Sequence, residues 1–134
     1  MENPMKILFD TNSLVFLAND SANKAVVEIF NNPKHEKYYS VASIWELVIK
    51  TMMNKVDLGV KIERFEEDLN VNGVRKLDIS TRHIYGLQRL KDIHKDPFDR
   101  IMVSQAITEG MEFITSDDRL SAYSDCVRYF PKTK

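Results

Sequence analysis

Short apolar runs alternate along this chain with segments of helical periodicity, and this alternation constrains the fold more than any other feature. The runs predicted as strands cover residues 6–9, 37–41, 74–79, 112–115 and 127–130. The predicted helices cover residues 14–18, 20–30, 43–53, 62–69, 80–90 and 97–109. Strands that are separated by helices usually pair in parallel, with the helices packed on both faces of the sheet. We therefore expect an α/β fold with a mainly parallel central sheet of four to five strands.

Length and composition place the chain among globular proteins of one domain. The 134 residues, 43% of them hydrophobic and 29% charged, fit a single domain that spans residues 1–134. The formal net charge of −1 does not by itself indicate a nucleic-acid partner. Cys126 is the single cysteine, which excludes an internal disulfide and a cysteine zinc site and fits a reducing, cytoplasmic compartment. No run of 18 apolar residues and no signal-peptide pattern is present, so we expect no membrane association.

The helix predicted over residues 97–109 has the strongest start and stop signals in the sequence, and it begins at an acidic residue. Asp96 occupies the expected N-cap position, and Pro97 follows at the first helical position, where its missing N–H costs nothing. Asp99 comes within the first turn, and Gly110 ends the helix. Two carboxylates are thus predicted at one helix N-terminus.

Acids also follow the other strands of the predicted sheet. Asp10 comes directly after the first strand, Glu46 one short turn after the second, and Asp117 directly after the fourth. Because the carboxyl ends of parallel strands share one edge, where ligands bind, we expect these acids and Asp99 to converge.

Each acid also has a purely structural interpretation. Asp10 could cap the first helix, although Ser13 is better placed, and Ser43 with Glu46 matches a capping box. Jointly, however, converging carboxylates repel one another unless a cation neutralises them. Oxygen ligands without cysteine suit Mg²⁺ or Mn²⁺, and a pair of such ions could direct water onto a phosphodiester.

The acidic segments resemble the four motifs of a known family. They are Phe9-Asp10-Thr11-Asn12, Ser43-Ile44-Trp45-Glu46, His94-Lys95-Asp96-Pro97-Phe98-Asp99-Arg100 and Thr115-Ser116-Asp117. In order and spacing they resemble the motifs of PIN domains, and in particular of the VapC-like toxins of toxin–antitoxin pairs. The resemblance runs from Ile7 to Phe130 and implies one PIN-like domain over residues 1–134.

The resemblance implies a function as well as a fold. It implies a Mg²⁺- or Mn²⁺-dependent ribonuclease that cuts RNA, is held inactive by a cognate antitoxin and forms a homodimer. Asp10, Glu46, Asp99 and Asp117 match the acids that bind metal and act in catalysis. The residues expected to support them are Thr11, Asp96, Thr115 and Arg100.

Two other interpretations remain open at this stage. One is a signalling domain of similar architecture, although a phosphoacceptor domain would need adjacent acids after the first strand. The other is a non-catalytic interaction module in which the acids serve as helix caps. Among the remaining residues, we expect the histidines to lie at the surface or in packing positions, and Trp45 with Met52 and Met53 to lie in the core or on a dimer face.

Overall fold

All five strands of the central sheet run parallel, in the order β3-β2-β1-β4-β5. The computed structural model of the protein describes residues 3–132. The strands are β1 (Lys6–Phe9), β2 (Glu36–Ser40), β3 (Val74–Leu77), β4 (Glu112–Thr115) and β5 (Val127–Tyr129). The expected parallel α/β sheet is therefore confirmed. Because β1 is central and the chain builds outward on both sides of it, the junctions after β1 and β4 lie next to each other.

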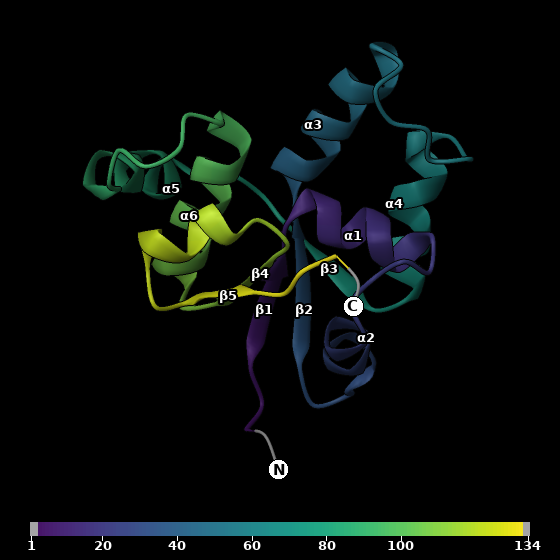
Figure 1. The fold of residues 1–134 in the computed structure, drawn as a ribbon, viewed down its shortest axis with the longest axis horizontal. Helices are drawn as coiled ribbons and strands as arrows, with labels where there is room; N and C mark the ends of the chain where they lie inside the picture. Colours follow the sequence, from purple (N-terminus) through teal and green to yellow (C-terminus); the bar gives the residue numbers. More distant parts are fainter. Residues whose placement is uncertain (1–2, 133–134) are drawn as a thin grey trace.

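Helices connect the strands and cover both faces of the sheet (Figure 1). The helices on the path from β1 to β3 are α1 (Thr11–Ala18), α2 (Lys24–Asn31), α3 (Val41–Met52) and α4 (Ile62–Val71). Those on the path from β3 to β5 are α5 (Thr81–Gly86), α6 (Pro97–Glu109) and the 3₁₀ segments η1 (Leu87–Arg89) and η2 (Asp118–Tyr123). Within residues 3–132, no helix combines the length and the apolar character that a membrane span requires.

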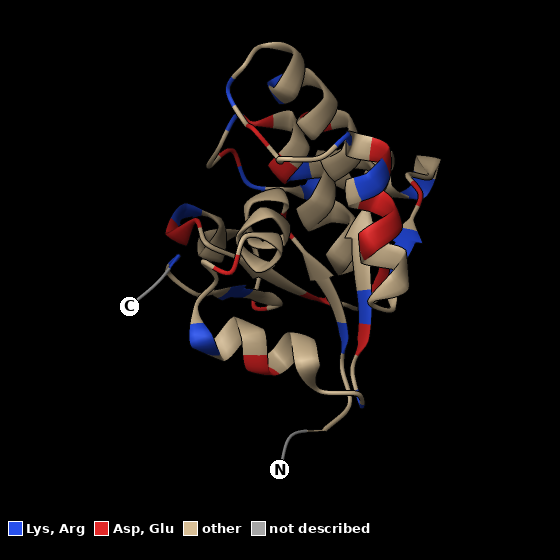
Figure 2. Cartoon of the chain, turned by 90° about the vertical axis from the view of Figure 1, so that its right-hand side faces the viewer, with Lys and Arg blue, Asp and Glu red and all other residues tan. Residues whose placement is uncertain are grey.

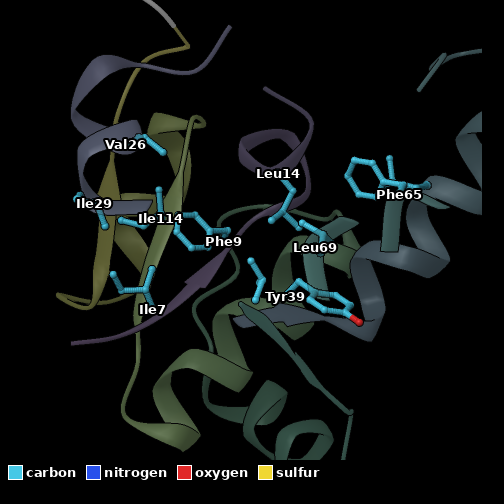
Figure 3. Close-up of a cluster of buried hydrophobic side chains, with 11 residues drawn as sticks. Ile7, Phe9, Leu14, Val26, Ile29, Tyr39, Phe65, Leu69 and Ile114 are labelled. Atoms are coloured by element: carbon cyan, nitrogen blue, oxygen red, sulfur yellow. The ribbon is translucent and has the colours of Figure 1, made fainter. Parts of the chain in front are cut away.

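Alternate residues of β1 point into two separate apolar cores. Ile7 and Phe9 pack with residues of α1, α2 and α4 on one face (Figure 3), whereas Leu8 packs with α6 and η2 on the other. All three side chains are fully buried, as expected for the central strand of a parallel sheet. Two-sided burial fixes β1 firmly, and with it the position of the residue that follows.

The structure differs from the sequence prediction at the start of α3. The helix was predicted to begin at Ser43, but β2 runs directly into it, and Ser40 caps it by accepting from Ala42 N at 3.0 Å. Ser43 and Glu46 therefore lie inside the helix, and the capping box predicted for them is wrong. Similarly, the helix predicted over residues 20–30 begins only at Lys24, with Asn23 as its N-cap.

The outer face of α3 is more exposed than its apolar sequence suggests. Trp45, Met52 and Met53 are 59%, 78% and 55% exposed. Of the two positions expected for them, the core is therefore wrong, and the dimer face stays a prediction. The three residues recur at helical spacing along the helix and its C-cap, and the Trp45 ring meets the Phe98 ring edge-on, with centroids 5.0 Å apart. The predicted helix over residues 80–90 is likewise divided into α5 and η1.

Charged residues of both signs are distributed over the side of the molecule that carries α3 and α4 (Figure 2). This distribution agrees with the formal net charge of −1. Any strong local field must therefore arise from side chains that gather in one place.

Candidate metal centre

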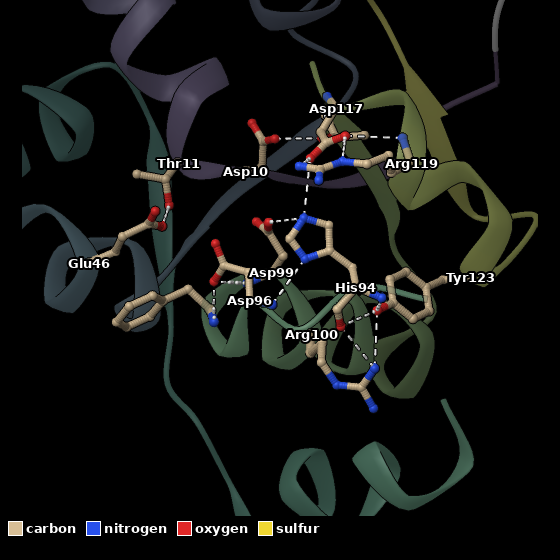
Figure 4. Close-up of polar contacts among 12 residues, drawn as sticks. Asp10, Thr11, Glu46, His94, Asp96, Asp99, Arg100, Asp117, Arg119 and Tyr123 are labelled. Atoms are coloured by element: carbon tan, nitrogen blue, oxygen red, sulfur yellow. Dashed lines mark hydrogen bonds and ion pairs between the residues drawn. The ribbon is translucent and has the colours of Figure 1, made fainter. Parts of the chain in front are cut away.

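Acidic side chains from four segments gather in a pocket of about 140 Å³ at the carboxyl edge of the sheet (Figure 4). The pocket is lined by residues that follow β1, by α3, by the start of α6 and by the segment after β4. Its lining residues are Asp10, Thr11, Asn12, Glu46, Lys50, His94, Asp96, Asp99, Asp117 and Arg119. The structure thus brings together the four acids that the sequence singled out. A larger cavity of about 500 Å³ lies elsewhere, between α1, α2 and α4, and is lined by both apolar and polar side chains.

Asp10 is fixed by hydrogen bonds to the start of α1 and to the end of β4. It is the N-cap of α1, where its Oδ1 accepts from Ser13 N at 2.8 Å, so the preference for Ser13 as the cap was wrong. Its Oδ2 accepts from the Thr115 hydroxyl at 2.6 Å, and its backbone N–H donates to Ile114 at 2.9 Å. Asp10 therefore joins the ends of β1 and β4, and Thr115 orients its carboxylate.

Glu46 is a buried carboxylate inside α3. Its Oε1 accepts from the Thr11 hydroxyl at 2.6 Å, and its Oε2 lies 2.6 Å from the Lys50 ammonium. Ser43, one turn earlier, lies 2.9 Å from the same Thr11 hydroxyl. Glu46 thus forms an ion pair with Lys50 one turn later, and Thr11 orients the carboxylate of Glu46 as Thr115 orients that of Asp10.

The start of α6 has the predicted form. Asp96 caps the helix by accepting from Phe98 N at 2.9 Å and Asp99 N at 3.4 Å, and Gly110 ends the helix in the left-handed conformation with φ of 69°. One oxygen of Asp96 is used in this way, while Asp99 projects into the pocket from the first turn.

Asp117 is the N-cap of η2 and lies partly exposed at the rim. Its two carboxylate oxygens accept from the Arg119 guanidinium, at 3.0 Å for Oδ1 and 2.7 Å for Oδ2. Its backbone N–H donates to the Thr115 hydroxyl at 3.0 Å. Thr115 therefore links Asp10 and Asp117, and Arg119 brings positive charge to the pocket wall.

His94 is a pocket residue that the sequence analysis placed at the surface or in packing. Its Nε2 lies 3.6 Å from Asp117 Oδ2 and 3.9 Å from Asp99 Oδ2, and its side chain is 12% exposed. The signal that identifies it is the spacing His-x-Asp, since its ring accepts from Asp96 N at 3.0 Å. This local bond turns the ring toward the acids.

Arg100, by contrast, does not face the acids. Its Nη1 donates to the carbonyl oxygens of Lys91 and His94 and lies 3.1 Å from the Tyr123 hydroxyl. Among the residues expected to support the acids, Arg100 thus holds the loop before α6, whereas Thr11, Asp96 and Thr115 lie at or against the pocket.

The environment of the pocket disfavours simultaneous ionisation of its acids. The pKa of Asp99 is raised to about 8, first by burial and then by the negative charges of Asp96, Asp10, Glu46 and Asp117. Burial also raises the pKa of Asp10, despite the hydrogen bonds that favour its ionised form. Five carboxyl groups thus face a small space in which their full negative charge is unfavourable.

Two basic side chains of the pocket wall, Arg119 and Lys50, pair with acids of the pocket and change the pKa values of these pairs. The hydrogen bond from Arg119 lowers the pKa of Asp117. Burial acts to lower the pKa of Lys50, but the hydrogen bond and the charge of Glu46 outweigh it and raise that pKa. Neither cation is paired with Asp99, whose raised pKa therefore reflects burial and the neighbouring negative charges.

The residues present fit a hard divalent cation. The carboxylates of Asp10, Glu46, Asp99 and Asp117 supply oxygen ligands from four segments, and the repulsion around Asp99 is the kind that a cation relieves. Oxygen donors without thiolates favour ions such as Mg²⁺ and Mn²⁺ over softer metals.

Comparison with known proteins agrees with the fold. A sequence model of the PIN domain matches residues 7–125. A toxin–antitoxin complex from Klebsiella pneumoniae contains a chain of similar structure, with a TM-score of 0.65 and 20% identity over 93% of this chain and 98% of that one. VapBC2 from Rickettsia felis, bound to a DNA fragment from its promoter, gives a TM-score of 0.65 and 18% identity over 96% of this chain and 98% of that one. No curated protein matches the chain.

Proposed function

The chain belongs to the PIN domain family, and from this premise we propose that it is a metal-dependent endoribonuclease that acts as the toxin of a toxin–antitoxin pair. The observation that carries the proposal is the convergence of Asp10, Glu46, Asp99 and Asp117 on one small pocket. Buried Asp99, with its pKa of about 8, adds a physical reason for a cation there, because an ion stabilises the ionised carboxyl groups.

The proposed chemistry is hydrolysis of an RNA phosphodiester. Asp10, Glu46, Asp99 and Asp117 would hold Mg²⁺ or Mn²⁺, which supplies, when bound, activation of water near neutral pH and neutralisation of the charge that develops on the phosphate. Thr115 and Thr11 keep the carboxylates of Asp10 and Glu46 in a fixed orientation through their hydroxyl donors. Orientation of this kind lowers the barrier because no rearrangement is needed during the reaction.

The alternative role of the acids as helix caps accounts for part of the site. Asp10, Asp96 and Asp117 do cap helices. Capping does not account for Glu46, which lies inside α3, or for Asp99, whose carboxyl is turned into the pocket. A purely structural role would leave Asp99 in an environment that disfavours its ionised form, without a compensating function.

The proposal includes partners. The two similar solved structures are toxin–antitoxin complexes, which supports a cognate antitoxin as the inhibitor of this chain in the cytoplasm. We also propose a homodimer, which is supported by the exposed apolar face that Trp45, Met52 and Met53 form on α3. Large exposed apolar side chains grouped on one face are typical of interaction surfaces.

The experiment that tests the function is cleavage of pooled RNA by the purified protein in Mg²⁺, in Mn²⁺ and in EDTA. We expect cutting that requires metal and that is at least 100-fold slower in D99N. D118N is the matched control, because Asp118 is an exposed acid beside the site that does not line the pocket. Absence of cutting in both metals, or equal cutting by wild type and D99N, would contradict the proposal.

A further inference from the structure

His94 is held in the wall of the pocket by contacts on both sides of its backbone. Its N–H donates to the Tyr123 hydroxyl at 3.0 Å, and its carbonyl oxygen accepts from the same hydroxyl at 2.9 Å and from Arg100 at 3.3 Å. Tyr123 belongs to η2, so the loop before α6 is fastened to the segment that follows Asp117. The imidazole is therefore a fixed part of the pocket.

The hydrogen bond from Asp96 assigns the tautomer of this imidazole. Asp96 N–H donates to Nδ1 at 3.0 Å, so Nδ1 uses its lone pair and the ring proton resides on Nε2. A histidine that binds metal through Nε2 must instead offer the lone pair there and carry its proton on Nδ1. Although Nε2 lies near Asp99 and Asp117 in a grouping that resembles a metal site, its N–H makes it a donor and not a ligand.

This donor has no hydrogen-bond acceptor among residues 3–132. The Nε2 atom is buried, and its separations of 3.6 Å from Asp117 and 3.9 Å from Asp99 exceed hydrogen-bond distance. An unsatisfied buried donor is costly, and few are found in native proteins. The Lys50 and Arg119 donors of the same pocket, in contrast, already contact Glu46 and Asp117.

We propose that the Nε2–H of His94 is a hydrogen-bond donor to a non-bridging phosphate oxygen of the RNA backbone, an assignment that rests on the proposed function. The carboxylates around the pocket can attract a cation but repel a phosphate, so the phosphate needs a donor that is fixed and not already engaged. In this role His94 donates a hydrogen bond and transfers no proton. Its role is to position the phosphate, and the acids hold the metal.

Two substitutions, H94N and H94Q, test the role of Nδ1 as an acceptor separately from the role of Nε2 as a donor. In H94N the amide oxygen can still accept from Asp96 N–H, as Asn commonly does two residues ahead, but no donor reaches the position of Nε2. In H94Q the longer side chain places an amide N–H near that position. H94N therefore tests the donor while preserving the loop, and H94Q tests its restoration.

The first measurement is binding of a labelled single-stranded RNA in Ca²⁺, followed by fluorescence anisotropy. We expect about 10- to 100-fold weaker binding by H94N, the range of a hydrogen bond to a charged group, and recovery in H94Q to within about fivefold of wild type. The melting temperatures of the metal-free proteins are expected to agree within about 3 °C, which would show that the loop is preserved.

The second measurement is Mn²⁺ binding by electron paramagnetic resonance. We expect equal Mn²⁺ affinity in wild type, H94N and H94Q, and no nitrogen coupling from a coordinated imidazole. Nitrogen coupling in wild type, with weaker Mn²⁺ binding in H94N, would make His94 a metal ligand and overturn the proposal. Equal RNA binding by wild type and H94N, or no RNA binding by wild type, would overturn it as well.

The two proposals fail in different ways. If wild type cuts RNA and H94N binds RNA equally well, the role of His94 alone is wrong. If wild type binds RNA more tightly than H94N but cuts none in Mg²⁺ or Mn²⁺, the ribonuclease assignment alone is wrong.

Discussion

Asp99 is the residue at which the pocket most clearly disfavours a negative charge. Its carboxyl group is buried next to four other acids, and the two pocket cations lie on Glu46 and Asp117 instead. The native protein therefore keeps a proton on Asp99 up to a pH of about 8, whereas the unfolded chain releases that proton near pH 4. Metal-free protein must consequently lose stability as the pH rises through this window.

This difference predicts the pH dependence of D99N. Without metal, we expect the free energy of unfolding of wild type to fall between about pH 4 and pH 8 and that of D99N to fall less, because the unfolded wild-type chain binds fewer protons than the native protein. At pH 8 we expect D99N to be more stable by about 2 kcal/mol, a value below the full conversion of its pKa shift because neighbouring carboxyls also adjust. Urea unfolding in EDTA at several pH values measures both quantities.

The matched control is D118N, since exposed Asp118 should leave the pH profile unchanged. D10N should gain less than D99N, because Asp10 caps α1 and accepts from Thr115, and Asn keeps only one acceptor oxygen. A D99N protein that is less stable than wild type at pH 8 would show that Asp99 has a structural role that the pocket does not reveal.

Single residues also show what the sequence could and could not predict. Asp96 was predictable as a cap because the evidence is local: Pro97 follows it, and apolar residues recur behind it. His94 was missed because its importance depends on Tyr123, 29 residues away, which fixes its backbone. The convergence of the four acids was expected from the rule that parallel strands end at one edge, but their hydrogen bonds to Thr11 and Thr115 came only through the family resemblance.

At the scale of elements, α6 supplies two carboxylates with different tasks. Asp96 caps the helix, and Asp99 points into the pocket one residue after the Pro97–Phe98 pair. Asp96 also contributes the largest of the charge effects that raise the pKa of Asp99. The helix start thus gains a cap while adding to the repulsion in the pocket.

The two effects of Asp96 can be separated by substitution. D96N retains an acceptor for Phe98 N and removes the negative charge, so we expect metal-free stability equal to or above that of wild type. D96A removes the cap and should lower the free energy of unfolding by about 1 kcal/mol. Thermal unfolding in EDTA compares them, and a D96N protein as unstable as D96A would contradict a capping role based on the acceptor oxygen.

The boundaries of helices and strands were predicted best where neighbouring residues in the sequence mark the end of the element. The bounds of β4 and the end of α6 at Gly110 agree with the sequence prediction, because an apolar run and a glycine in the left-handed conformation define them. The start of α3 was placed too late because β2 enters the helix without a loop, so no break in hydrophobicity separates Ser40 from Val41. The exposure of Trp45 was not predictable either, since it depends on which neighbours cover each face of α3.

At the scale of the whole molecule, the sheet order places β1 between two halves of the fold. The acids after β1 and β4 meet because the two strands are neighbours, and α3 and α6 bring Glu46 and Asp99 to the same edge. The sequence predicted a parallel sheet but not this order, because strand neighbours depend on long-range packing. The exposed face of α3 is left outside both cores.

The proposed homodimer makes this exposed face testable. We expect wild type to sediment as a dimer and the double variant M52D/M53D to sediment as a monomer with a similar melting temperature, because both methionines are largely exposed in the single chain. Analytical ultracentrifugation measures the change. V71D is the matched control, because Val71 is equally exposed at the end of α4 and should leave the dimer intact; a monomeric wild type would contradict the dimer.

The hydrogen bond between Thr115 and Asp10 joins residues 105 positions apart and has a consequence for biosynthesis. During translation, Asp10 emerges early from the ribosome, whereas Thr115, Asp117 and the Tyr123 that clamps His94 are added near the end. A nascent chain that stalls before β4 therefore carries most of the acids without the pocket that assembles them. If the protein is the ribonuclease proposed here, an unfinished copy therefore lacks the assembled site that cleavage requires.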